Sequence, residues 1–213
     1  YILKIQSQIK DAQILMDLPG NKVRTASFPD GYIDIHENEE FSIYFNQMNY
    51  KEFFKHLSPG DEVWANDSIF KFVVKSVDLE LTKINFLSYS SGKLLNNKGM
   101  HVRGIHKNIP FLFEKDKKLI KLANKYNLDF VGLSFVRNAK DIKSAKKLIT
   151  SSTIISKVET LSAVDNLEEI LEEVEYILID RGDLSTEIGL SKVPSYQKFI
   201  IDKAVFCNKK VFL

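Results

Sequence analysis

Residues 110–213 alternate between short apolar runs and longer segments of helical periodicity, and this alternation constrains the fold more than any other feature. Strand-like runs lie at 130–135, 154–158, 176–179 and 211–213, and helical patterns lie at 114–126, 141–149, 164–174 and 196–207. Such alternation with short connections predicts right-handed βαβ units and a parallel sheet. A (β/α)8 barrel and an open doubly wound sheet both fit, although no glycine-rich nucleotide motif supports the second. A complete barrel needs about eight units, so a barrel here would be partial.

Residues 26–107 follow a two-residue alternation instead. It is seen at Ile33/Ile35, Ile43/Phe45, Phe70/Phe72 and Ile84/Phe86, and turn signals at 29–31, 58–61 and 90–92 interrupt it. This pattern predicts short antiparallel strands in a small sandwich or barrel. The first residues predict a helix over 1–12 and a buried strand over 13–18. We therefore expect a segment of the α/β part at 1–25, a β-rich domain at 26–107, and the main α/β part at 108–213.

Composition excludes several classes of protein. The chain of 213 residues is 44% hydrophobic and 27% charged, with a net charge of +2, which is ordinary for a globular protein and gives no basic footprint for nucleic acid. Cys207 is the single cysteine, so no internal disulfide can form and a cytoplasmic location is expected. No apolar run has the length of a membrane span. The chain begins at Tyr1 and ends inside an apolar run, so we expect a piece of a longer protein.

Charged groups follow two of the predicted strands. Lys157 and Glu159 lie two residues apart at the end of the run at 154–158, so strand alternation places them on one face. Gly182 and Asp183 follow the run at 176–179. A cation beside carboxylates at one edge of a parallel sheet suggests a metal-assisted site, and structural ion pairs are the alternative. His101 and His106 are expected at the surface.

Five segments of this chain resemble the pyruvate kinase family. They are Leu-Met-Asp-Leu-Pro-Gly-Asn-Lys-Val-Arg-Thr at 15–25, Asn-Lys-Gly at 97–99, Ser-Phe-Val-Arg at 134–137, Ile-Ser-Lys-Val-Glu at 155–159 and Arg-Gly-Asp-Leu at 181–184. The resemblance implies an α/β fold, namely a partial TIM (β/α)8 barrel with an inserted small all-β domain. It also implies a glycolytic transferase that moves a phosphoryl group from phosphoenolpyruvate to ADP and yields pyruvate and ATP.

The resemblance also assigns roles around the substrate. Glu159 and Asp183 would hold Mg²⁺ or Mn²⁺, and Lys157 would stabilise the developing enolate as the catalytic cation. Gly182 and Asp183 would present amide groups to the substrate carboxylate. Ser134 and Phe135 would line the pocket.

Other residues are assigned to the nucleotide and to a monovalent cation. Arg24 and Lys98 would contact the nucleotide phosphates. Asp17 resembles a ligand of the K⁺ that many members need, but Leu18 replaces the usual threonine. Lys22 stands where K⁺-dependent members carry glutamate, so we expect no K⁺ requirement.

Departures from the family pattern leave two alternatives open. Asp180 replaces a small residue before Arg181, and Ser185 replaces a glycine. The first alternative is a non-catalytic or truncated paralogue that binds a phosphorylated keto-acid ligand or a partner. The second is a metal-dependent lyase that stabilises a pyruvate enolate. We expect no nucleic-acid or membrane partner, and a homo-oligomer is left open.

Overall fold

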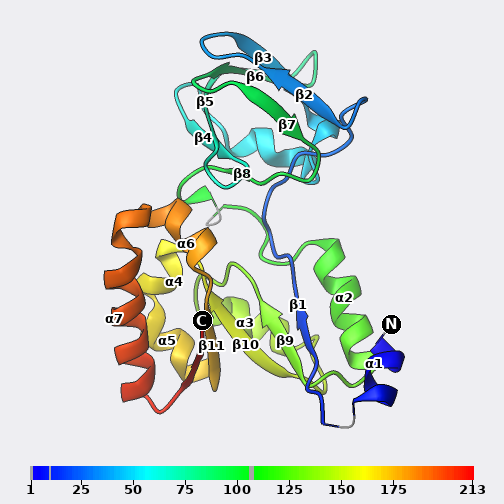
Figure 1. Cartoon of the computed structure of the whole chain (residues 1–213), viewed down its shortest axis with the longest axis vertical. Coiled ribbons are helices and arrows are strands. Elements are labelled where there is room, and N and C mark those ends of the chain that lie inside the picture. The colour runs from blue at the N-terminus through cyan, green and yellow to red at the C-terminus, as the bar shows by residue number, and fades with distance from the viewer. Residues whose placement is uncertain (1, 10, 106–107) are drawn as a thin grey trace. The chain divides into compact units, whose positions relative to one another are not determined.

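The computed structural model describes residues 2–9, 11–105 and 108–213, and Figure 1 shows its helices and strands. Contacts divide the chain into two units, the first made of residues 1–21 and 110–213 and the second of residues 22–109. The predicted domain limits lie at 25/26 and 107/108. Each unit has its own hydrophobic core. His106 lies outside the described residues.

The first unit is built on a parallel sheet (Figure 1). Among the described residues, five strands stand in the order β1, β9, β10, β11 and β12, and they span Leu15–Asp17, Phe130–Leu133, Thr153–Val158, Tyr176–Ile179 and Lys210–Phe212. Every neighbouring pair is parallel, which confirms the predicted parallel sheet. The spatial order follows the chain order without the reversal that marks a doubly wound sheet.

Helices precede and connect these strands. They are α1 Ile2–Gln8, α2 Glu114–Lys125, α3 Ala139–Lys146, α4 Leu161–Asp165, α5 Leu167–Glu173, α6 Arg181–Ile188, the 3₁₀ helix η4 Leu190–Lys192 and α7 Val193–Phe206. The helix predicted over 164–174 is divided in two, because Asn166 leaves helical geometry with φ −106° and ψ 24°. Within the described part of the chain, no helix is long and apolar enough to cross a membrane.

Strand β10 is buried on both faces, and the two faces differ in chemistry. Ile154 and Val158 belong to the hydrophobic core, together with helix residues such as Ile142 and Ile170. Because successive side chains of a strand alternate, Lys157 lies on the opposite face. Lys157 is nevertheless only 6% exposed. The sheet therefore holds a buried ammonium on the face that its core helices do not cover.

The second unit consists mainly of antiparallel strands. In its described part, β2 Tyr32–Ile35 pairs with β7 Gly92–Leu95, and a second sheet has the order β3, β6, β5, β4 and β8. These five strands span Glu40–Tyr44, Lys83–Ser88, Phe70–Asp78, Glu62–Ala65 and Met100–His101, and two 3₁₀ helices lie at η1 Phe45–Gln47 and η2 Lys51–His56. Fully buried aromatic residues, including Phe53, Phe72 and Phe86, fill the core of this unit.

Two local predictions about the second unit are wrong. The alternation at Ile43/Phe45 predicts a strand through Phe45, but β3 ends at Tyr44. There the Gln47 side chain accepts a 2.9 Å hydrogen bond from the Tyr44 amide and favours the turn of η1. His101 is not at the surface, because β8 pairs with β4 and leaves the histidine 9% exposed.

Candidate functional site

The carboxyl ends of four neighbouring strands meet around Lys157. In the register of the sheet, Asp17 of β1 is opposite Gly132, and Val158 of β10 is opposite Ile179 of β11. Side chains that end or follow these strands therefore gather at one edge, as parallel pairing requires. This geometry brings together several of the residues that the sequence singles out, namely Asp17, Ser134, Lys157, Glu159 and Asp183, and it adds Asp180.

The Lys157 ammonium is surrounded by carboxylates. Its Nζ lies 2.8 Å from Glu159 Oε1, 3.2 Å from Asp180 Oδ2 and 3.3 Å from Asp17 Oδ2. It also donates a 3.1 Å hydrogen bond to Ser134 Oγ. Burial lowers the pKa of Lys157, but the three carboxylates outweigh burial and hold that pKa above its usual range. Lys157 is therefore a fixed, buried and charged group.

Glu159 is the most deeply buried carboxylate of the site. It is 0% exposed, and its Oε2 accepts a 2.6 Å hydrogen bond from the Phe135 amide. Burial raises the pKa of Glu159 and Lys157 lowers it; with the added repulsion of Asp183 and Asp180, the pKa lies at about 8. The Lys157 ammonium therefore lowers the pKa of Glu159 by less than burial and the neighbouring carboxylates raise it.

Three of these carboxylates form a cluster that fits a divalent cation. Glu159, Asp180 and Asp183 each offer one oxygen, and these oxygens lie within 4.8 Å of one another. Two oxygens on opposite sides of one ion lie about 4 to 5 Å apart for Mg²⁺ or Ca²⁺. Carboxylate oxygens are the ligands that such hard cations prefer. The donor set and its spacing thus suit Mg²⁺ or Mn²⁺.

The start of α6 positions two of these carboxylates. Asp180 is the N-cap residue, and its Oδ1 accepts a 3.4 Å hydrogen bond from the Asp183 amide. Lys157 and that amide both stabilise the Asp180 carboxylate, so its pKa is lowered although burial raises it. A side chain added at Gly182 would meet only Asp180 Oδ1, at 3.4 Å. The described structure therefore does not itself explain why glycine stands at 182.

Ser134 and Phe135 follow β9 and contact the central pair of the site, Ser134 through Lys157 and Phe135 through Glu159. The strand predicted through Phe135 ends at Leu133, and Phe135 adopts a left-handed backbone with φ 56°. Such a φ is uncommon for a bulky residue and tends to occur at functional sites. It points the Phe135 amide at Glu159. Gly20, at φ 65°, packs against this turn, where an added Cβ would lie 2.9 Å from atoms of both Ser134 and Phe135.

The remaining predicted residues belong to the second unit. The backbone of Arg24 forms an isolated antiparallel β-bridge with Gly99. Its side-chain Nη1 donates a 3.2 Å hydrogen bond to the Asn97 carbonyl. The Lys98 amide donates to Thr25 Oγ1 at 2.9 Å, so the segments of Arg24 and Lys98 lie side by side. Lys22 Nζ is 3.6 Å from Asp67 Oδ1. The structure thus brings Arg24 and Lys98 together within that unit.

Asp180 is the residue whose role sequence reasoning missed. The sequence shows it only as a departure from the family pattern before Arg181. The available signal was its place directly after the run at 176–179, the same relation that Glu159 has to the run at 154–158.

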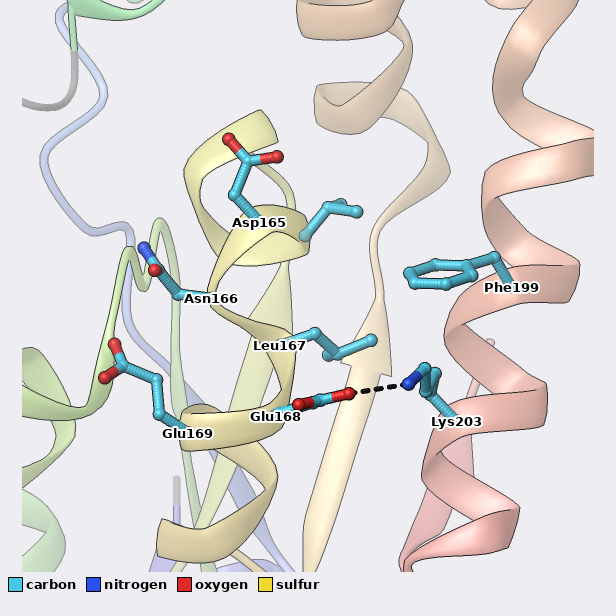
Figure 2. Close-up of a pocket in the computed structure, with 8 residues that line it drawn as sticks. Asp165, Asn166, Leu167, Glu168, Glu169, Phe199 and Lys203 are labelled. Atoms are coloured by element: carbon cyan, nitrogen blue, oxygen red, sulfur yellow. Dashed lines mark hydrogen bonds and ion pairs between the residues drawn. The ribbon is translucent and has the colours of Figure 1, made fainter.

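A separate hollow lies on the helical side of the first unit (Figure 2). It has a volume of about 390 Å³ and is lined by residues 164–169 of α4 and α5 and by Phe199 and Lys203 of α7. Figure 2 shows Phe199 pointing toward α5, and Lys203 Nζ lies 2.6 Å from Glu168 Oε1. None of the predicted site residues lines this hollow, so it is not the candidate site.

Comparisons with known proteins point to one family. A family model described as "Pyruvate kinase, barrel domain" matches residues 3–213. A pyruvate kinase of Clostridium perfringens is 30% identical over 224 residues, which cover 98% of this chain and 46% of the relative. A pyruvate kinase of Staphylococcus aureus (strain MRSA252) is 29% identical over 213 residues, which cover 94% of this chain and 36% of the relative. The chain thus spans less than half the length of these relatives.

Proposed function

Because this chain belongs to the pyruvate kinase family, we propose that it takes part in phosphoryl transfer from phosphoenolpyruvate to ADP, which yields pyruvate and ATP. The observation that carries the proposal is the buried Lys157 ammonium at the carboxyl edge of a parallel sheet. It lies 2.8 Å from Glu159 and 3.1 Å from Ser134. A fixed charge of this kind suits a reaction in which negative charge develops on the substrate.

We assign Glu159 and Asp183 as ligands of a divalent cation, Mg²⁺ or Mn²⁺. Support comes from the spacing of their oxygens, within 4.8 Å, and from the surplus of negative charge around Lys157. When bound, such a cation neutralises and polarises phosphoryl and carbonyl oxygens. Phe135 keeps one Glu159 oxygen in place through its amide, so the carboxylate is oriented in advance.

Lys157 would act on the oxygen of the enolate that forms as the phosphoryl group leaves. An ammonium carries three donors, and Ser134 together with the carboxylates fixes its direction. Charge that is already oriented in a buried site stabilises a transition state without reorganisation at the moment of reaction. We further propose that the amides of Gly182 and Asp183 hold the substrate carboxylate at the start of α6, and that Phe135 helps to exclude water.

We also propose that the first unit is part of a (β/α)8 barrel and that the second is its inserted all-β domain. The parallel strand order without reversal supports the first assignment. The antiparallel pairing of residues 32–101 supports the second. Arg24 and Lys98 would bind nucleotide phosphates, and Lys22 would make added K⁺ unnecessary.

A coupled assay of pyruvate formation tests this proposal. The protein in its native length is given phosphoenolpyruvate, ADP and Mg²⁺, with and without K⁺. We expect K⁺-independent activity, and we expect Lys157→Met to lower kcat by about 10²-fold or more. Lys209→Met, which removes a half-buried lysine outside the candidate site, should keep kcat unchanged. Pyruvate formation that is equal in the Lys157 and Lys209 variants would contradict the role given to Lys157.

One observation favours a second candidate, a non-catalytic member that binds a cation or a phosphorylated keto acid. Asp180 and Asp17 both contact the Lys157 ammonium and reduce the charge that it offers to a substrate. The same assay decides between the two candidates. Absence of pyruvate, together with Mn²⁺ binding that depends on Glu159, would establish the non-catalytic reading.

A further inference from the structure

Asp180 adds a carboxylate to the candidate metal site that the family resemblance does not supply. The resemblance places a small residue before Arg181, and this chain has an aspartate there. Its side chain is held from two sides, by Lys157 Nζ at 3.2 Å and by the Asp183 amide at 3.4 Å. A carboxylate has about four acceptor positions on its two oxygens. Asp180 can therefore keep both contacts and still coordinate a cation.

The position of Asp180 matches that of a ligand. One of its oxygens lies within 4.8 Å of an oxygen of Glu159 and of an oxygen of Asp183. Oxygens that share a cation lie about 3 Å apart when adjacent on it and about 4 to 5 Å apart when opposite. The three carboxylates thus need only small side-chain rotations to share one ion. Asp180 is about one-third exposed, so an ion can reach it from solvent.

A second observation indicates that the protein alone does not complete this cluster. Glu159 Oε1 is fully buried and accepts no hydrogen bond from any described residue, although Lys157 Nζ lies 2.8 Å away. A buried carboxylate oxygen normally has a partner in good geometry. Three carboxylates, those of Asp17, Glu159 and Asp180, contact the one ammonium, and Asp183 lies beside Glu159 and Asp180. A divalent cation would add positive charge beside Glu159, whose ion pair with Lys157 lacks hydrogen-bond geometry.

We propose that Asp180 is a third carboxylate ligand of the divalent cation, so that this chain binds the metal without any substrate. The inference rests on the proposed function for the identity of the other two ligands, Glu159 and Asp183. With two carboxylates, much of the coordination of Mg²⁺ or Mn²⁺ falls to water and substrate oxygens. A third carboxylate raises the charge of the site, and affinity for a hard cation rises with the number of charged ligands.

Titration with Mn²⁺ alone, followed by electron paramagnetic resonance of the free ion, tests the inference. Asp180→Asn removes the charge and keeps a good N-cap residue for α6. Asp180→Ser is a second variant that also caps the helix but is too short to reach the ion. The control is Asp202→Asn, which removes an exposed carboxylate of α7 in the same unit. Circular dichroism confirms that each variant is folded.

We expect one Mn²⁺ site in the unaltered chain, weakened about tenfold or more in both Asp180 variants and unchanged in Asp202→Asn. Glu159→Gln should abolish the site. Equal Mn²⁺ affinity within twofold in the unaltered chain and the Asp180 variants, or no binding by the unaltered chain, overturns the inference. Because no substrate is present, failure to form pyruvate would refute the proposed reaction without changing this result.

Discussion

Lowering the pH should destabilise the second unit through His101. This histidine lies in the edge strand β8, opposite Trp64 of β4, and it is 9% exposed. Burial, together with the nearby positive charges of Lys22 and Arg103, lowers its pKa from 6.5 to about 4. The folded unit therefore holds a neutral imidazole that resists protonation.

The sign and size of the effect follow from linkage. Below about pH 6.5 the unfolded chain takes up a proton at this position and the folded chain does not, so stability falls as the pH falls toward about 4. The change in pKa from 6.5 to about 4 corresponds to about 3 kcal/mol in total. Between about pH 7.5 and about pH 5 the expected loss is about 2 kcal/mol.

Urea unfolding followed by Trp64 fluorescence measures this loss, because Trp64 is the only tryptophan and lies in the same unit. The variant His101→Gln cannot titrate, and His36→Gln removes an exposed histidine of that unit as the control. Between the two pH values, the free energy of unfolding should fall by about 2 kcal/mol more in the unaltered chain and in His36→Gln than in His101→Gln. Identical pH dependence in the unaltered chain and His101→Gln would show that His101 does not cause the loss of stability. Since each variant is compared with itself at two pH values, any pH-independent cost of the substitution cancels.

Three further substitutions test how each unit is held together. Asp116→Ala removes a fully buried carboxylate that accepts hydrogen bonds from the amides of Gly20 (3.0 Å) and Phe113 (2.8 Å). Thermal unfolding should show that the free energy of unfolding falls by about 2–4 kcal/mol, and a fall below about 0.5 kcal/mol would contradict this prediction. Gly20→Ala should destabilise by more than about 1 kcal/mol, because the residue has φ 65° and its Cβ would lie 2.9 Å from Phe135; unchanged thermal unfolding would argue against that close approach. Phe53→Ala should lower the free energy of unfolding by about 3–5 kcal/mol, measured by urea unfolding with Trp64 fluorescence, because Phe53 is fully buried. An unchanged free energy would mean that the surrounding residues fill the space left by the ring.

The edge of the parallel sheet could be predicted because it depends only on local periodicity and on pairing. Two-residue alternation puts Lys157 and Glu159 on one face, and parallel pairing brings the ends of successive strands to one edge. Ser134 and Asp17 are assigned to the site by the family resemblance alone, and the structure places both beside Lys157. The two rules hold here because β10 is fully regular from Thr153 to Val158.

Other features depend on contacts between residues far apart in the sequence, and local patterns could not show them. His101 is buried because a two-residue strand pairs with β4, which lies more than 30 residues earlier. The backbone leaves the strand pattern at Phe135, whose amide donates a hydrogen bond to Glu159. Side-chain alternation does not predict that contact. The break at Asn166 is decided by a single residue inside an otherwise continuous helical pattern.

Because Lys157 and Glu159 form a buried ion pair, a Lys157 variant can lose activity either through its chemistry or through its fold. Burying both charges costs several kcal/mol of desolvation, and a buried pair is often no more stabilising than apolar residues of the same size. Stability alone therefore gives little reason for the pair. Removing only Lys157 leaves Glu159 buried among Asp180 and Asp183 and can cost about 3–5 kcal/mol, so a Lys157 variant can lose activity by losing its fold. Replacing Lys157 and Glu159 together by methionine and leucine relieves that cost. If stability returns in the double variant and activity does not, the pair is present for its chemistry and not for the fold.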